Sequence, residues 1–180
     1  FNRDGVTPLD RFEPHHFTRE HWAAIGFNPA GRAPWRASLA LSKSQRRRMQ
    51  RKAQQIDPEA AAYATSHGAF QIMGFHARRL GYASALDMVE QFKTIAGQID
   101  GFVNFILANN LDGALRRHDW LTFASGYNGS GQARRYAALI AKAYRRFANG
   151  RPSVEILGIG SRGESVAALQ QRLVAAGYQV

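Results

Sequence analysis

The residue whose setting first suggests chemistry is Gln71, the single amide inside an apolar run. It lies between Phe70 and Ile72 in the segment SHGAFQIMG, Ser66–Gly74, which has a polar entry and two glycines. The run is too short and too glycine-bounded for a good helix, and it is too apolar for an ordinary loop. A buried amide without partners costs about 1–3 kcal/mol. Either the protein or a bound ligand must therefore supply hydrogen bonds to Gln71.

A second glycine-framed segment, GYNGSG at residues 126–131, has a related make-up. Tyr127 and Asn128 place an aromatic ring beside an amide, as Phe70 and Gln71 do, and Gly129 follows them. Aromatic and amide groups together suit the apolar faces and acetamido groups of amino sugars. The alternative is that the amides only cap the ends of helices.

Glu13 is an acidic residue whose neighbours in the sequence are aromatic residues and a proline, which is not typical of a helix cap. It lies between Phe12 and Phe17 and beside Pro14, whereas most of the 13 acidic residues have the positions of caps or exposed partners. A carboxyl in apolar surroundings holds its proton more firmly and can act as a general acid. The competing interpretation is a structural pair with Arg11 or a histidine, and structural ion pairs outnumber catalytic acids.

Other chemistries find little support in the sequence. The histidines lack the spacing of a metal site, and the absence of cysteine excludes a thiol nucleophile and cysteine-ligated zinc. No nucleophile elbow is present, and the glycine-rich segment 158–163 has no lysine for a phosphate loop. We therefore expect neither a metal nor a cofactor.

The charge balance points to an anionic polymer as partner. The chain has 180 residues and a formal net charge of +11, which favours nucleic acid, a membrane surface or an anionic cell wall. Residues 36–52 hold seven basic side chains and no acidic one. No aromatic residue is interleaved with the charges from Lys43 to Lys52, so a solvated helical face is favoured over a nucleic-acid site. No run is long enough to cross a bilayer, and no secretory signal is visible at the start.

The elements that must position these residues are mainly α-helical, because no convincing alternating strand pattern occurs. Asp57, Pro58 and Glu59 together form a strong helix start that should lead into Thr65. Further helices are expected from Thr18, Ser44 and Ser84, the last with Asp87 in a capping box. Apolar spacing also predicts helices with the faces Leu86–Val89–Phe92, Ile99–Phe102–Val103–Ile106–Leu107 and Tyr136–Leu139–Ile140–Ala143–Tyr144–Phe147, and a short helix over 119–123.

The motifs resemble a known family when they are taken together. GAFQIMG, the Asp119-Trp120 pair and YNG resemble the lysozyme-like superfamily. RFEPHHF (11–17), the basic helix, SHGAFQIMGF (66–75) and FASGYNGSG (123–131) more closely resemble the N-acetylmuramidase family of phage endolysins and related bacterial proteins. The likeness covers roughly residues 1–147. It implies a mainly helical, lysozyme-like fold with little sheet.

The resemblance also implies an activity and a site. Such enzymes cut the β-1,4 bond between N-acetylmuramic acid and N-acetylglucosamine in peptidoglycan by general acid catalysis. The family's acid is a glutamate just before a Gly-Phe pair, and Phe1 matches that phenylalanine, so the main acid is expected before Phe1. Glu13 matches the next motif, as a second carboxylate or a structural support. The substrate-binding residues implied are Ser66, His67, Phe70, Gln71, Tyr127, Asn128 and Gly129.

The C-terminal tail resembles the first half of a helical peptidoglycan-binding module. Its pattern is Gly160, Gly163, Val166, Leu169 and Gln170. We therefore expect a muramidase domain at 1–150, without its N-terminal segment, and a linker with half a wall-binding module at 151–180.

The resulting hypothesis is a peptidoglycan hydrolase that is made in a bacterium or phage-infected host and acts on the wall, in the periplasm or from outside. Its partners would be glycan strands and anionic wall polymers, with no specific nucleic acid. The alternatives are a lytic transglycosylase and a non-catalytic basic domain that binds wall or nucleic acid.

Overall fold

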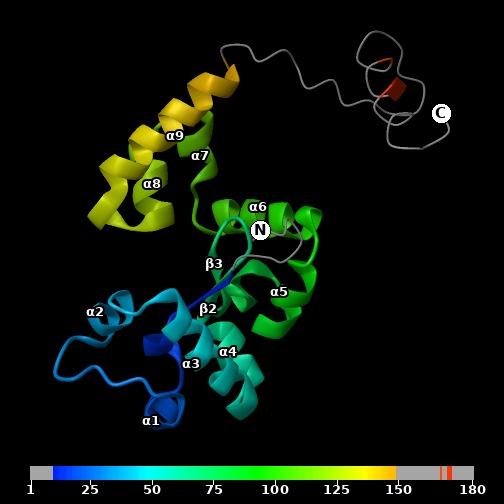
Figure 1. Cartoon of the computed structure of the whole chain (residues 1–180). Helices are drawn as coiled ribbons and strands as arrows, with labels where there is room; N and C mark the ends of the chain where they lie inside the picture. Colours follow the sequence, from blue (N-terminus) through cyan, green and yellow to red (C-terminus); the bar gives the residue numbers. More distant parts are fainter. Residues whose placement is uncertain (1–9, 149–166, 168–169, 172–180) are drawn as a thin grey trace. The chain divides into compact units, whose positions relative to one another are not determined.

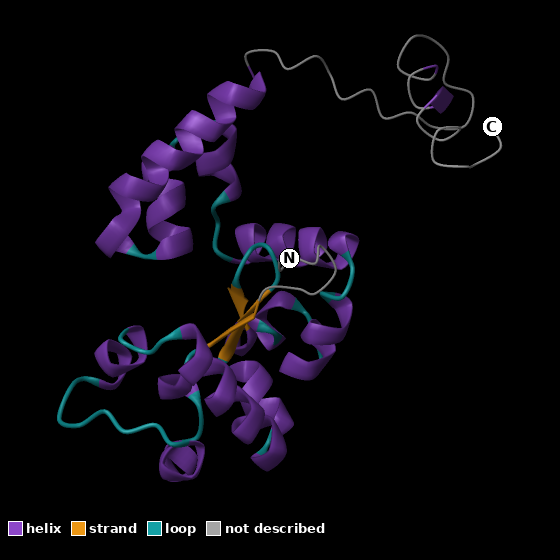
Figure 2. Ribbon diagram, viewed as in Figure 1, coloured by secondary structure: helices purple, strands orange, loops and turns teal. Residues whose placement is uncertain are grey.

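The structure is a computed structural model that describes residues 10–148, 167, 170 and 171. The chain divides into two compact units, residues 1–116 and 117–180, which we describe separately (Figure 1). Most of the predicted wall-binding tail and the predicted boundary near residue 150 lie outside the described residues. The mainly helical class is confirmed, since the described part has short strands in one small sheet and helices elsewhere (Figure 2).

The first unit starts with a strand and short helical turns that lead into a long basic helix. The order is β1 (Asp10–Phe12), η1 (Pro14–His16), η2 (Arg19–His21), α1 (Trp22–Ile25), α2 (Pro34–Leu39) and α3 (Lys43–Ile56). Thr18 makes no side-chain cap, so the helix expected from it is reduced to η2 and α1. The long helix starts two residues earlier than predicted. Ser42 caps it in a full capping box with Gln45, whereas we expected Ser44 to do so.

The next helix confirms its predicted start, but not its end. In α4 (Pro58–Tyr63) the Asp57 carboxylate accepts from the Ala60 amide at 2.9 Å. The helix stops at Tyr63, and Thr65 already belongs to a strand. The buried Thr65 hydroxyl donates back to the Ala61 carbonyl at 2.7 Å, which fixes this change from helix to strand.

The segment singled out in the sequence, Ser66–Gly74, is mostly a β-hairpin. Strands β2 (Thr65–His67) and β3 (Ile72–Met73) pair antiparallel, and β1 pairs with the other edge of β2. In this register Arg11 lies opposite Ser66, and Ser66 lies opposite Met73. The sheet lies at the centre of the first unit in Figure 2. It joins β1, the first strand of the described residues, to the hairpin, since Arg11 pairs with Ser66, 55 residues later.

The core of this region is built from side chains of β1, α1, α2, α3 and α4 and of the segments that join them. Its buried members are Phe12, Phe17, Ile25, Phe27, Ala37, Met49, Ala53, Ala61 and Ala64. Alanines at 53, 61 and 64 let α3, α4 and β1 approach closely. This core therefore packs against the sheet through Phe12 of β1.

The remaining elements of the first unit are η3 (Gly74–His76), η4 (Arg78–Leu80), α5 (Ala85–Gln91), α6 (Ile95–Ala108) and α7 (Asp112–Arg116). Their predicted faces are partly wrong. In α6 the residues Ile99, Val103 and Leu107 are exposed, whereas Gln98, Gly101 and Phe105 are buried. The reason is that Gly101 leaves room for the Phe92 ring, so the helix packs through its small and polar side.

Helix α5 shows the same kind of correction. Ala85, Met88 and Phe92 are buried, whereas Leu86 of the predicted face is 45% exposed. Ser84 caps the helix by accepting from the Asp87 amide at 3.0 Å, as predicted. The reciprocal bond of the capping box goes instead to the residue before the cap, since the Asp87 carboxylate accepts from the Ala83 amide.

The second unit contains α8 (Trp120–Asn128), η5 (Ser130–Gln132) and α9 (Ala133–Ala148). Asp119 caps α8 as expected, but the helix continues past Phe123 and includes Tyr127 and Asn128. The predicted glycine-rich break therefore starts only at Gly129, whose φ is +81°. No helix in the described part of the chain is long and apolar enough to cross a membrane.

Candidate functional site

The turn of the hairpin is shaped by two residues with left-handed backbone. Gly68 has φ +72°, and Gln71 has φ +51°, which is uncommon for a residue with a side chain. The amide and the side-chain Nε2 of Gln71 both donate to the Gly68 carbonyl, at 3.2 and 2.8 Å. The Gln71 side chain thus helps to hold its own strained turn.

A buried amide from another helix fixes the same turn from behind. Gln98 of α6 is 2% exposed, and its Oε1 accepts from the Ala69 amide at 2.8 Å. Its Nε2 donates to the Phe92 carbonyl at 2.8 Å. A Cβ on Gly68 would come within 2.7 Å of the Gln98 Oε1. Gly68 is therefore required both by the backbone angle and by the close approach of Gln98.

The predicted burial of Gln71 is wrong, because the side chain is exposed at the turn. The protein supplies partners for it. The buried Ser66 hydroxyl donates to the Gln71 Oε1 at 3.1 Å, besides the bond from Nε2 to Gly68. The amide is thus held in a defined orientation at the surface, where a ligand can reach it.

His67 is buried, and both of its ring nitrogens face hydrogen-bond acceptors. The Nδ1 lies 3.0 Å from the Asp10 Oδ1, and the Nε2 lies 2.9 Å from the Ala62 carbonyl oxygen. These contacts tie β2 to β1 and to α4. The structure thus places His67 behind the hairpin, where it supports the strands.

Glu13 lies among polar donors rather than in the apolar surroundings expected for it. Its Oε2 accepts from the Ser38 hydroxyl at 2.6 Å and from the Arg46 Nη1 at 3.0 Å, and its Oε1 is 3.0 Å from the Arg11 Nε. The His15 Nδ1 is 3.9 Å away. Pairing with Arg11 was the competing interpretation from the sequence. The carboxylate joins β1, α2 and α3, and both of its oxygens are occupied.

Arg46 is the buried centre of this network. Its guanidinium also donates to the Phe12 carbonyl at 3.0 Å and to the Ser38 carbonyl. The side chains of Arg46 and Glu13 are only 9% and 12% exposed. Loss of one partner would leave the other charged group buried without compensation, which is strongly unfavourable.

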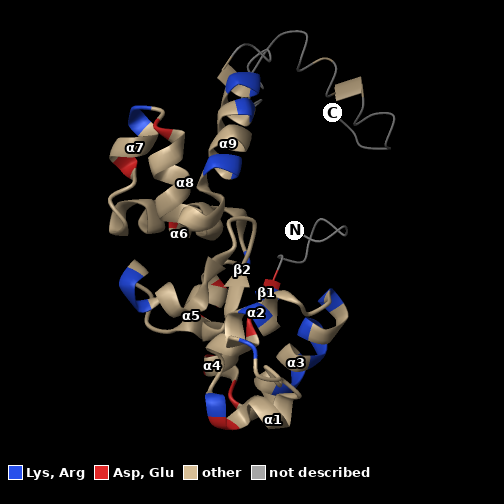
Figure 3. Cartoon of the chain, turned by 90° about the vertical axis from the view of Figure 1, so that its left-hand side faces the viewer, with Lys and Arg blue, Asp and Glu red and all other residues tan. Residues whose placement is uncertain are grey.

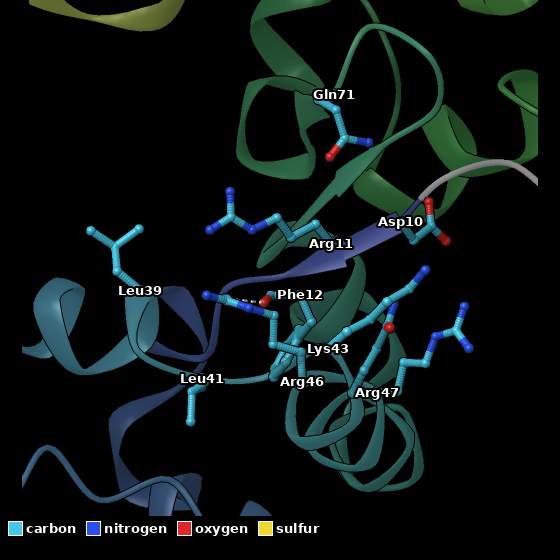
Figure 4. Close-up of a pocket in the computed structure, with 10 residues that line it drawn as sticks. Asp10, Arg11, Phe12, Leu39, Leu41, Lys43, Arg46, Arg47 and Gln71 are labelled. Atoms are coloured by element: carbon cyan, nitrogen blue, oxygen red, sulfur yellow. Dashed lines mark hydrogen bonds between the residues drawn. The ribbon is translucent and has the colours of Figure 1, made fainter. Parts of the chain in front are cut away.

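A pocket of about 370 Å³ opens between β1, the start of α3 and the hairpin turn (Figure 4). Arg11 and Gln71 line it from the sheet side, and Leu39 and Leu41 line it from the chain before α3. The complete lining is Asp10, Arg11, Phe12, Leu39, Leu41, Lys43, Arg46, Arg47, Gln50 and Gln71. The hairpin residue that we expected to bind sugar therefore borders a cavity with both apolar and cationic walls.

Of the predicted binding residues, Gln71 alone is in this pocket's lining. The Phe70 ring stacks on Phe102 of α6, with centroids 4.3 Å apart. Tyr127 stacks on Phe123 at 5.6 Å, and burial raises the pKa of its phenol. Asn128 and Gly129 are exposed at the end of α8. The predicted pairing of Gln71 with Tyr127 and Asn128 spans the two units and stays a prediction.

Three histidines of the first unit have a lowered pKa. Burial is the largest cause that lowers the pKa of His15, followed by the neighbouring charge of His16. Burial also lowers the pKa of His16 and of His76. Within residues 10–148, 167, 170 and 171, no group of three potential ligands is arranged to hold a metal ion.

Sequence reasoning missed four residues that organise this site, namely Asp10, Ser38, Arg46 and Gln98. Asp10 and Ser38 carry no motif, and their roles depend on contacts 57 and 25 residues away in sequence. Arg46 was hidden among similar basic residues, although it is the buried cation of α3. Gln98 left no clear signal, since it lies one turn before Phe102 at the edge of the expected apolar face of α6.

Two comparisons with known proteins place these features in a family. The family model for N-acetylmuramidase, named Muramidase, matches residues 1–148. A solved structure, "Crystal structure of Burkholderia AP3 phage endolysin", is 33% identical, with a TM-score of 0.64. The match covers 83% of this chain and 60% of the endolysin chain, so this chain spans less than two thirds of that protein's length. No match was found among curated proteins.

The family match covers both units and includes Glu13, the hairpin and the Tyr127–Gly129 segment. It agrees with the helical fold and small sheet described above, and with the structural likeness to the endolysin. The chain belongs to the N-acetylmuramidase family.

Proposed function

We propose that this chain is part of a peptidoglycan hydrolase that cuts the β-1,4 bond between N-acetylmuramic acid and N-acetylglucosamine. The observation that carries the proposal is the family match over residues 1–148, together with a pocket bordered by the fixed amide of Gln71. The endolysin likeness supports action on the bacterial wall, from the periplasm or outside. The net charge of +11 supports attraction to anionic wall polymers.

The hairpin turn would bind one sugar of the glycan strand. An amide that is exposed but held by Ser66 and Gly68 is ordered before the ligand arrives. Such preorganisation reduces the entropy lost on binding. Phe70, with the segment Tyr127–Gly129, would provide the further contacts implied by the family. Ser66 and His67 would act by holding the turn in place.

The chemistry would be protonation of the glycosidic oxygen by a carboxylic acid, followed by attack of water. Glu13 is our candidate within this chain, either as the acid or as support for another carboxylic acid. Its contacts with Ser38, Arg46 and Arg11 favour the supporting role, because a group that accepts from three donors is poorly placed to donate a proton.

The two roles of Glu13 predict different results for Glu13→Gln. In either role the free energy of unfolding falls by about 3 kcal/mol, because Arg46 loses its partner. If Glu13 is the acid, wall cleavage by the folded variant also falls more than about 100-fold. If Glu13 only supports β1 and α3, the folded variant keeps most of its wall cleavage. Urea unfolding and turbidity clearing of purified walls, measured on the same preparations, separate these results.

The reaction itself is tested by mass spectrometry of the fragments released from purified peptidoglycan. Reducing N-acetylmuramic acid ends support hydrolysis. Anhydro ends would show a lytic transglycosylase instead. A chain that is pulled down by walls but releases no fragment would act as a binding domain only. Strong DNA binding with a steep salt dependence, and none to walls, would refute the proposal altogether.

A further inference from the structure

The N-terminal turns of helix α3 carry basic residues, which destabilise a helix at that end. Lys43 is its first residue, Arg46 and Arg47 follow within the next turn, and no acidic residue is present in the first turn. Positive charges near a helix N-terminus are unfavourable, because that end already carries partial positive charge. Figure 3 shows the basic residues gathered along α3. Local exceptions of this kind often mark functional positions.

Only one of these three cations has a structural role in the fold. Arg46 is buried and bonded to Glu13 and to the Phe12 carbonyl. Lys43 and Arg47 are exposed, and their side chains make no ion pair or hydrogen bond within residues 10–148. They are one helical turn apart, and both line the pocket. In Figure 4 their side chains extend together from α3, whereas Arg46 turns toward the Phe12 carbonyl.

The other walls of the pocket narrow the choice of ligand. Four of the ten lining residues are cationic and one is acidic, so the pocket favours an anion. Leu39, which is 58% exposed, and Leu41 add an apolar wall. The one aromatic in the lining, Phe12, is buried, so no ring is available to stack on a nucleobase. The ligand should carry a carboxylate beside small apolar groups.

We propose that Lys43 and Arg47 bind a carboxylate of the peptide stem of peptidoglycan. The inference rests on the proposed function, because the stem is attached to the N-acetylmuramic acid of the glycan. The stem joins free carboxylates to the methyl groups of alanine, which match the cationic and leucine walls. Gln71, at the other edge of the pocket, would contact the glycan from which the stem extends. The pocket therefore selects glycan that carries acidic stems.

The test is a calorimetric titration of the whole 180-residue chain with three probes. These are a disaccharide with a tetrapeptide stem, the same compound with its stem carboxylates converted to carboxamides, and a stem-free N-acetylglucosamine tetramer. At low salt, the double variant Lys43→Gln/Arg47→Gln should bind the acidic stem about five- to tenfold more weakly than the unaltered chain does. Its affinity for the other two probes should equal that of the unaltered chain. The unaltered chain should bind the carboxamide probe more weakly than the acidic stem, by the same roughly five- to tenfold factor. The loss should shrink in 1 M salt.

The matched control is Arg48→Gln/Arg51→Gln. It removes the same charge from the same helix, at exposed positions outside the pocket. Its binding of the acidic stem should change less than about twofold. Circular dichroism checks that both double variants keep their helix content.

Equal binding of the acidic and carboxamide stems, or equal losses in the two double variants, would overturn the stem subsite and leave the peptidoglycan proposal intact. A loss of duplex DNA binding confined to Lys43→Gln/Arg47→Gln, with stem binding unchanged, would also overturn it. If the unaltered chain binds neither walls nor any of the three probes, the proposed function itself fails.

Discussion

The close contact between Gly68 and Gln98 makes a strong prediction about stability. Gly68→Ala places a methyl group on a backbone with φ +72°, which costs about 1 kcal/mol. The new Cβ would lie 2.7 Å from the Oε1 and 2.9 Å from the Cδ of Gln98. Because Gln98 is buried and bonded at both ends, it must give up its bond to the Ala69 amide. That loss adds about 2 kcal/mol.

The total of about 3 kcal/mol corresponds to a fall of roughly 6–12 °C in Tm. Thermal unfolding followed by circular dichroism measures it. The matched control is Gly26→Ala, since Gly26 has φ +82° but nothing within 4 Å of the added Cβ. The control should lose only about 1 kcal/mol, which reflects the backbone angle alone.

A double variant isolates the contact with Gln98. In a Gln98→Ala background the clash is absent, so Gly68→Ala should then cost only about 1 kcal/mol. An equal loss from Gly68→Ala with and without Gln98, or an equal loss from the Gly26 control, would refute the role assigned to Gln98.

Two other predictions concern pH and helix capping. Burial lowers the folded-state pKa of His15, His16 and His76 below 6.5, so their contribution to stability is complete above pH 6.5 and is lost as the pH falls through the folded values. Urea unfolding should show a lower free energy of unfolding at pH 5.5 than at pH 7.5. This free energy should depend less steeply on pH in His76→Phe. A free energy of unfolding that does not change between these two pH values would contradict the prediction. Glu59 accepts from the Ala85 amide at 2.7 Å at the start of α5, so Glu59→Gln should lose about 1 kcal/mol, and an unchanged urea midpoint would count against this cap.

The sequence allowed the helical class, the family and several helix starts to be predicted, because these depend on local patterns. The caps at Asp57, Ser84 and Asp119 were predicted and are present. Each depends on residues within three positions of the cap. The start of α3 was misplaced because Ser42 and Ser44 are both good caps, and only the Gln45 bond distinguishes them.

The errors in the fold come from contacts between distant segments. The apolar spacing of α6 predicted the buried face only in part, since Ile106 is buried but Ile99 and Val103 are exposed. The helix packs differently because Gly101 accommodates Phe92 and Gln98 bonds to the hairpin. Strands of two or three residues were too short to show an alternating pattern. Their pairing is stabilised by His67 and Asp10, which are 57 residues apart.

The candidate site was predicted in part. The segment around Gln71 does border a pocket, but its amide is exposed rather than buried. The surroundings of Glu13 could not be predicted, because Ser38 and Arg46 reach it from α2 and α3. Nor could the cationic wall be assigned, since the sequence does not separate Lys43 and Arg47 from the other basic residues of α3.

The pocket beside the hairpin turn is where we propose that the chain binds a glycan strand. The most direct measurement is a titration of the ¹⁵N-labelled chain with a stem-free N-acetylglucosamine tetramer, followed by backbone and side-chain amide NMR shifts. We predict saturable shifts at the Gln71 side-chain amide, at Ala69 and Phe70, and at Arg11 in β1. Saturable binding that leaves these signals unmoved and shifts others would contradict the claim.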